Sequence, residues 1–117
     1  MSDRIVVTGH RKVRGDAGEF ARRVFATFTR PGQEFLIGMA VGWDMACAQA
    51  CADLGITFHA VLPFKEQPNR WPVPAQRQYH ELLAVARTVS IVSDRPSHAA
   101  YMERNLVMLG ACDGSVW

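Results

Sequence analysis

The sequence predicts an α/β fold, a three-layer Rossmann-like open parallel sheet of about five strands with helices on both faces. Short β-branched runs alternate along the chain with amphipathic segments of about ten residues, a pattern typical of parallel strands joined by helical crossovers. Glycine or proline follows each of the first three apolar runs, as expected where a strand ends and a loop begins. The 117 residues are enough for one core, so we expect a single domain over residues 1–117.

The first unit begins with the run Arg4–Thr8, which predicts a buried strand that ends at Gly9. Asp16 is expected to cap the following helix, because an aspartate oxygen accepts hydrogen bonds from the free N–H groups of a first helical turn. Helical spacing marks the apolar residues after it, which are Phe20, Ala21, Val24, Phe25 and Phe28. Pro31 and Gly32 end this helix.

The second unit contains a strand over Phe35–Ile37, a helix over Asp44–Leu54 and a third strand over Thr57–Leu62. Gly55 is expected directly after the helix, because glycine readily adopts the left-handed conformation that ends many helices. Four prolines within residues 63–74 exclude a helix interior or a central strand and predict a long, stiff loop. Long loops of this kind are often functional.

The last unit contains a helix from about Ala75 to Ala86, a fourth strand over Thr88–Val92 and a helix over about Ala99–Leu109, with a further strand beginning near Val116. In an open parallel sheet, the loops that lead from strands to helices meet at the edge formed by the carboxyl ends of the strands. The loops expected to converge there cover residues 9–15, 38–43, 63–74 and 93–99.

Composition weighs against several classes of partner. The formal net charge of +2 provides no strong field for nucleic acid or a membrane surface, so nucleic acid is predicted to be a poor partner. No apolar run reaches the roughly 18 residues of a membrane span, and no signal-peptide pattern precedes the first strand. We therefore expect a cytoplasmic protein that does not contact membranes.

The three cysteines are an odd number in a chain of ordinary composition, which predicts reduced thiols. Cys47 and Cys51 lie one helical turn apart without further cysteine or histidine at ligand spacing. We expect them to pack in the core, and we predict neither a metal site nor a cofactor.

The turn after the second strand is the strongest candidate for a binding site. Gly38 and Gly42 bracket this turn, and Asp44 opens a helix whose first N–H groups and positive dipole end favour an anion such as phosphate. A tight turn alone also explains the two glycines. Asp44 is either a helix cap or a group that binds a ribose hydroxyl or polarises water at an N-glycosidic bond.

Further candidate residues lie near the ends of other predicted elements. Arg11 closely follows Gly9, where its planar guanidinium can hold a phosphate. Trp71 either covers the pocket and stacks on a base or anchors the long loop on the domain. Arg104 and Asn105 are adjacent polar residues inside the last helix, which a purely structural helix does not require.

The string Ile37–Asp44 resembles the signature of the SLOG superfamily, a Rossmann-like group that contains the DNA-processing protein Smf/DprA and the LOG nucleotide hydrolases. Other features resemble its small YpsA-like branch of bacterial and phage proteins, namely Thr8 to Arg11, Pro63 with Phe64, Gln67 and Trp71, Tyr79 with Leu82 and Leu83, and Arg104 with Asn105.

The resemblance implies a set of ligand contacts at one edge of the sheet. These candidates are Thr8, Gly9, His10, Arg11, Gly38, Gly42, Asp44, Pro63, Gln67, Trp71, Arg104 and Asn105, with Asp44 as the catalytic residue if the protein is an enzyme. Related proteins self-associate, and an exposed last strand would pair readily with another chain. A homodimer or higher oligomer is therefore expected.

Two departures limit what the resemblance implies. Residues 38–44 do not reproduce the P-G-G-x-G-T-x-x-E motif whose glutamate serves catalysis in the LOG hydrolases. SLOG proteins also continue beyond the strand near Val116 into a G-G-T turn and a helix, whereas this sequence ends at Trp117. The chain is therefore expected to be either a naturally short form or one that lacks this part.

Three functions are compatible with these features. The leading prediction is binding of a nucleotide or nucleotide-derived ligand at the carboxyl edge of the sheet, for example as a sensor. The second is hydrolysis or transfer at an N-glycosidic bond of a nucleotide, with Asp44 as the acid/base group and Arg11 holding phosphate. Binding of single-stranded nucleic acid, by analogy with DprA, ranks third because the net charge is near neutral and aromatic residues do not interleave with basic ones.

Overall fold

The computed structural model describes residues 3–7 and 16–111, which form four strands and four helices in alternation. These are β1 (Asp3–Val7), α1 (Ala17–Phe28), β2 (Gln33–Ile37), α2 (Trp43–Leu54), β3 (Phe58–Leu62), α3 (Val73–Val85), β4 (Thr88–Ile91) and α4 (His98–Ala111). The predicted α/β fold with a parallel sheet is confirmed, although the described residues contain four strands where about five were expected. The strand expected near Val116 lies outside the described residues.

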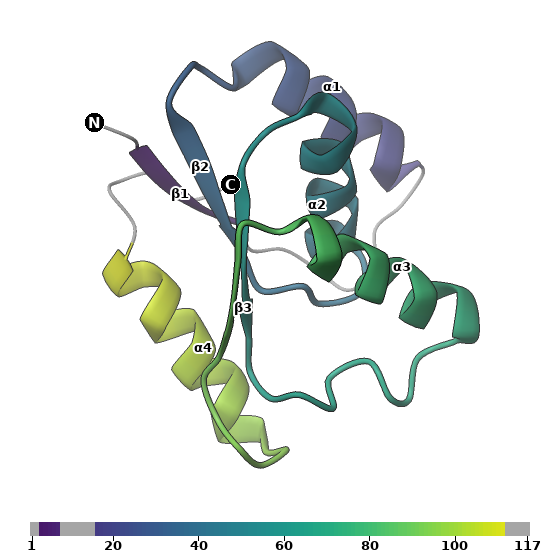
Figure 1. The fold of residues 1–117 in the computed structure, drawn as a ribbon, viewed down its shortest axis with the longest axis vertical. Coiled ribbons are helices and arrows are strands. Elements are labelled where there is room, and N and C mark those ends of the chain that lie inside the picture. Colours follow the sequence, from purple (N-terminus) through teal and green to yellow (C-terminus); the bar gives the residue numbers. More distant parts are fainter. Residues whose placement is uncertain (1–2, 8–15, 112–117) are drawn as a thin grey trace.

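The strands lie in the order β1-β2-β3-β4, so each strand pairs with the one that precedes it in the sequence. With this consecutive order, crossovers of one hand place the three connecting helices on the same face of the sheet. Figure 1 shows α1, α2 and α3 on that face and α4 on the other. The three predicted layers are therefore present, with the helices unequally divided between the two outer layers.

Side chains that alternate along the strands divide the core into two clusters. The larger cluster lies under α1, α2 and α3 and includes Ile5, Val7, Phe25, Phe35, Ile37, Met45, Phe58, Ala60, Tyr79 and Leu82. The smaller cluster lies under α4, where Met108 packs on Val6, Leu36 and Val61. Burial on both faces explains why these short strands are almost continuously apolar in the sequence.

The first helix begins as predicted but buries less of its apolar surface. The Asp16 carboxylate accepts a hydrogen bond from the backbone N–H of Glu19 at 3.0 Å, which caps α1. Only Ala21 and Phe25 of this helix are buried, whereas Phe20 is 59% exposed and Phe28 is 62% exposed. Helical spacing therefore located the helix correctly and overestimated the width of its buried face.

The second helix begins one residue earlier than predicted, at Trp43, and its N-cap is Gly42. Asp44 is therefore not the helix cap. The predicted end is confirmed, since Gly55 adopts the left-handed conformation with φ of 70°. None of the described helices combines the length and the apolar character needed to cross a bilayer.

Candidate functional site

The turn between β2 and α2 lies at the carboxyl edge of the sheet and has an unusual backbone. Met39 adopts a φ of 61°, which is uncommon for a residue with a side chain, and that side chain is completely buried. Gly42 has a φ of 98° and offers no side-chain acceptor to the first N–H groups of α2. Strained backbone of this kind concentrates at functional sites, so this turn is the centre of the candidate site.

Arg104 of α4 binds the start of this turn. Its Nη1 donates hydrogen bonds to the carbonyl oxygen of Gly38 at 2.8 Å and to Oε1 of Gln67 at 3.2 Å. Its guanidinium carbon lies 5.4 Å from the ring centroid of Tyr101, close enough for a cation–π contact. Because Arg104 is only 6% exposed, these acceptors replace much of the water that would otherwise solvate its charge.

Gln67 connects the loop after β3 to the same turn. Its Nε2 donates to the carbonyl oxygens of Gly38 at 3.2 Å and Met39 at 3.4 Å, while its Oε1 accepts from Arg104. Gln67 is also buried, at 6% exposure. We call Arg104 and Gln67 with these bonds the Arg104–Gln67 brace. The brace joins the β2–α2 turn, the β3–α3 loop and α4 into one unit.

Gly38 lacks a side chain at the point where Arg104 approaches most closely. A Cβ atom added at Gly38 would lie 2.8 Å from Cζ of Arg104 and 2.9 Å from its Nε and Nη1. Atoms at these distances overlap, and the guanidinium is held in place by its hydrogen bonds. Close packing of Arg104 therefore explains Gly38 independently of any ligand.

The carboxyl group of Asp44 is buried against the same turn, with 5% exposure. Its Oδ2 accepts a hydrogen bond from the backbone N–H of Ala40 at 3.3 Å, and its Oδ1 has no partner among the described residues. Burial raises the pKa of Asp44 to about 6, although the bond from Ala40 and the positive charge of Arg104 act in the opposite direction. Asp44 thus spans the turn, and a catalytic role for it stays a prediction.

We expect Asp44 to make the protein less stable as the pH rises from about 4 to about 7. The folded state keeps the Asp44 proton up to a pKa of about 6, whereas the unfolded chain loses it near 3.8. Between these values the folded state binds more protons, so its stability falls with rising pH, by about 3 kcal/mol in total.

Urea unfolding of the wild type and of Asp44→Asn, at about pH 4 and about pH 7, measures this effect. The wild type is expected to lose about 2 kcal/mol more than the variant between the two conditions, because part of the total effect already occurs below pH 4. The same loss in both proteins would show that Asp44 titrates as it does in the unfolded chain.

The other predicted site residues occupy different positions around this turn. Pro63 is fully buried directly after β3. Trp71 is partly buried and packs edge-on against Tyr79, with ring centroids 5.4 Å apart, which agrees with its alternative as a loop anchor. Asn105 is exposed, and its Oδ1 accepts from Nε of Arg104 at 3.2 Å. Thr8, Gly9, His10 and Arg11 lie outside the described residues.

The structure therefore brings Gly38, Asp44, Gln67 and Arg104 into one site, with Gly42 at its end. Tyr101 was missed, although its position three residues before Arg104 on a helix places the two on one face. The backbone N–H of Ala40 was also missed, and no pattern of residue types identifies such a group.

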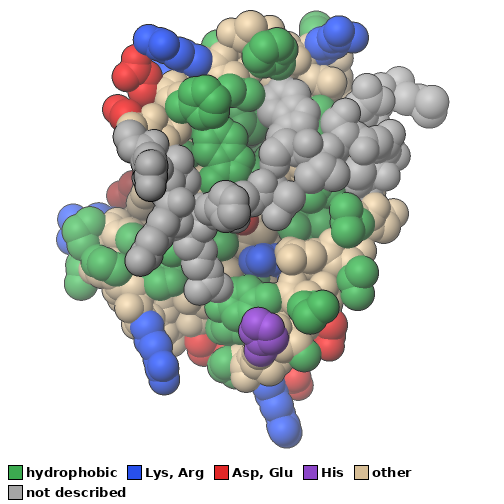
Figure 2. All heavy atoms as spheres, turned by 180° about the vertical axis from the view of Figure 1, so that it is seen from behind, with side chains coloured by type: hydrophobic (Ala, Val, Ile, Leu, Met, Phe, Trp, Pro, Cys, Tyr) green, Lys and Arg blue, Asp and Glu red, His purple; other side chains and the backbone are tan. Residues whose placement is uncertain are grey.

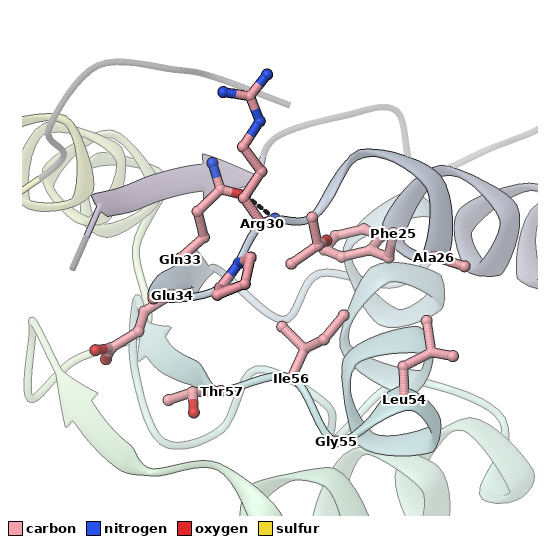
Figure 3. Close-up of a pocket in the computed structure, with 12 residues that line it drawn as sticks. Phe25, Ala26, Arg30, Gln33, Glu34, Leu54, Gly55, Ile56 and Thr57 are labelled. Atoms are coloured by element: carbon pink, nitrogen blue, oxygen red, sulfur yellow. Dashed lines mark hydrogen bonds between the residues drawn. The ribbon is translucent and has the colours of Figure 1, made fainter.

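A hollow of about 550 Å³ lies at the opposite edge of the sheet, between the end of α1 and the starts of β2 and β3. Figure 3 shows Phe25, Leu54 and Ile56 lining it, with one hydrogen bond from the N–H of Arg30 to Oε1 of Gln33, 2.7 Å long. Helices end rather than begin at this edge, so it lacks the N-terminal N–H groups that bind anions. We therefore do not place the functional site there.

Within the described ranges, no group of three or more His, Cys, Asp or Glu side chains is arranged to hold a metal ion. Cys47 and Cys51 are buried free thiols, as expected. Burial raises the pKa of both, so they stay protonated and unreactive near neutral pH. Cys112 lies outside the described residues.

Two solved structures superpose on nearly the whole chain. DNA processing protein A from Streptococcus pneumoniae gives a TM-score of 0.72 at 18% identity, over 98% of this chain and 41% of its own. DNA processing protein A from Helicobacter pylori, whose structure was described for its single-stranded DNA binding mode, gives a TM-score of 0.68 at 12% identity. This match covers 97% of this chain and 52% of the H. pylori chain. No family model and no curated protein matches the sequence. The similarity establishes the fold, and the chain spans about half of these proteins or less.

These neighbours correct the order of the predicted functions. DNA processing protein A belongs to the SLOG superfamily, and the H. pylori protein is described as binding single-stranded DNA. The leading prediction of a nucleotide-derived ligand is therefore wrong, as is the expectation that nucleic acid is a poor partner. The error has a physical cause, because net charge is a sum over the chain, whereas single-stranded DNA is bound by local cations and by stacking on aromatic rings.

Proposed function

We propose that this domain binds single-stranded DNA at the carboxyl edge of its sheet. The observation that carries the proposal is the match of 97% of the chain to the fold of the H. pylori protein, which is described as binding single-stranded DNA. Open α/β sheets bind their ligands at the carboxyl ends of the strands, and the Arg104–Gln67 brace fixes the loops at that edge.

The groups proposed to contact the DNA backbone bind phosphate by local contacts and not through the net charge of the chain. The N-terminus of α2 has the positive end of its dipole at Gly42, without a side-chain acceptor from the N-cap residue. We also propose Arg11, with Thr8, Gly9 and His10, as phosphate-binding residues in the segment that follows β1 in the sequence. We also propose that the chain is related to the YpsA-like branch of SLOG proteins.

Electrostatic attraction contributes only part of the proposed binding. Among the described residues, Figure 2 shows Lys and Arg side chains at separate places on one face, with hydrophobic side chains between them. The formal net charge is +2. With about two or three phosphates neutralised, the logarithm of the binding constant should fall with the logarithm of the salt concentration with a slope of about −1.5 to −2.

Fluorescence anisotropy with a labelled oligothymidylate, and with a duplex of the same length, tests the proposal at several salt concentrations. We expect the protein to bind the single strand more tightly than the duplex, with the shallow slope given above. Arg11→Ala should reduce the slope by about 0.7, the value for one phosphate contact. Arg87→Ala is the matched control, because Arg87 is an exposed cation just before β4, at the opposite edge, and should leave the slope unchanged. Equal binding of both DNAs, or binding of neither, would contradict the proposal.

A further inference from the structure

We infer from the geometry that Phe20 of α1 and Trp43 of α2 form a platform on which one unpaired base of the bound DNA stacks. The inference rests on the proposed function. It assigns base recognition, in addition to backbone binding, to two residues that are not among the site residues predicted from the sequence. We call Phe20 and Trp43 the aromatic platform.

The two rings are in contact and differ in exposure. Their centroids lie 5.7 Å apart with the ring planes inclined by 42°, within the range of favourable aromatic pairs. Trp43 is partly buried and packs against the larger core cluster, which fixes its ring on one side. Phe20 is 59% exposed, although it belongs to the apolar stripe of α1. A partly buried aromatic ring in contact with an exposed one forms a surface on which another planar ring, such as a base, can stack.

The platform lies beside the β2–α2 turn. Trp43 is the first residue of α2 and stands between Gly42, the N-cap, and the buried Asp44. Phe20 is in the first turns of α1, which packs along α2. Both helices begin at the carboxyl edge of the sheet. If a phosphate of a DNA single strand binds at the N-terminus of α2, a base of that DNA therefore lies within reach of these rings.

A hollow of about 240 Å³ lies between the N-terminal parts of α1, α2 and α3, and Gly42, the residue that precedes Trp43, is among the residues that line it. Gly18, Gly42 and Met45 line it together with the amide side chains of Gln49 and Gln78. Nε2 of Gln78 donates to Oε1 of Gln49 at 3.2 Å, so the two amides hold each other at its rim. Amide groups pair with the polar edges of bases, and unstacked bases are recognised by aromatic stacking together with such edge contacts.

Phe28 provides an internal comparison on the same helix. It is exposed to a similar extent, at 62%, and makes no ring contact with another described residue. It is the last residue of α1, near the opposite edge of the sheet. Exposure alone therefore does not distinguish Phe20, whereas its contact with Trp43 and its position at the candidate site do.

Anisotropy titrations with a labelled oligothymidylate and an abasic strand of the same length test the inference. Phe20→Ala should weaken binding of oligothymidylate by about 5- to 150-fold, the range for loss of one base–aromatic stack. Phe20→Tyr keeps the ring and should bind within about twofold of the wild type. Phe28→Ala should have no effect. On the abasic strand, Phe20→Ala and the wild type should bind equally, because no base is there to stack.

A second readout uses Trp43 itself and does not depend on how well Phe20→Ala folds. Of the three tryptophans, Trp71 and Trp117 are replaced by phenylalanine so that only Trp43 emits. Oligothymidylate should quench this emission along the anisotropy curve, and the abasic strand should not. Equal quenching by both strands, or equal loss of affinity for both in Phe20→Ala, would overturn the platform. If Phe20→Ala binds oligothymidylate as tightly as the wild type does, the aromatic platform is overturned and the proposed function still stands. If the wild type binds no DNA, both the platform and the proposed function are overturned.

Discussion

Gly38→Ala is expected to lower the free energy of unfolding by about 2–4 kcal/mol. The new methyl group would lie 2.8 Å from Cζ of Arg104, so either the guanidinium or the β2–α2 turn has to move. Movement of the guanidinium stretches its bond to the Gly38 carbonyl and its bond to Gln67 inside a buried site. Urea unfolding, monitored by tryptophan fluorescence, measures the loss.

Gly110→Ala in α4 is the matched control for this substitution. An added Cβ at Gly110 has no heavy atom within 4 Å, and the residue lies inside a helix, where alanine is favoured over glycine. The same change should therefore stabilise the protein by about 0.5–1 kcal/mol at Gly110 while destabilising it at Gly38. If both variants were stabilised, the close approach of Arg104 to Gly38 would be wrong.

Arg104→Ala is expected to cost about 3–4 kcal/mol of unfolding free energy. It leaves the carbonyl of Gly38 and the Oε1 of Gln67 without this donor in a buried place, and it removes the cation that favours the charged form of Asp44. Glu103→Ala changes the exposed neighbouring residue and should stay within about 0.5 kcal/mol of the wild type. Similar losses in both variants would show that α4, and not the brace, is sensitive to substitution.

The two large effects should not add, because they share one contact. Once Arg104 is removed, the methyl group at Gly38 no longer meets its guanidinium, so the double variant should be at least about 1 kcal/mol more stable than the sum of the single losses predicts. Strict additivity would mean that Gly38→Ala acts through some other contact.

The sequence predicts the fold well because the fold depends on local patterns. Apolar strands buried on both faces, an aspartate cap at Asp16 and a glycine at the left-handed position of Gly55 are each determined by a few neighbouring residues. The start of α2 was misplaced by one residue, because glycine served as the N-cap where aspartate was the expected type.

The brace could not be predicted in the same way. Arg104 and Gly38 are 66 residues apart in the sequence, and no local pattern shows that a residue of α4 enters the β2–α2 turn. The adjacent polar residues Arg104 and Asn105 were noticed in the sequence, and the structure gives Arg104 a buried bracing contact, while a ligand-binding role for either residue stays a prediction. The exposure of Phe20 could not be predicted either. Helical spacing identifies the apolar face of α1, but it does not show how much of that face the neighbouring helix buries.

Amide chemical-shift mapping with unlabelled oligothymidylate tests most directly whether the carboxyl edge of the sheet binds single-stranded DNA. A binding surface at this edge predicts shifts at the β2–α2 turn over residues 38–44, at the first turns of α1 and along residues 63–71. It predicts no shifts at Thr29, Gln33 and residues 55–57, which line the large hollow at the opposite edge. Shifts confined to that opposite edge, or none at saturating DNA, would contradict single-stranded DNA binding at the proposed site.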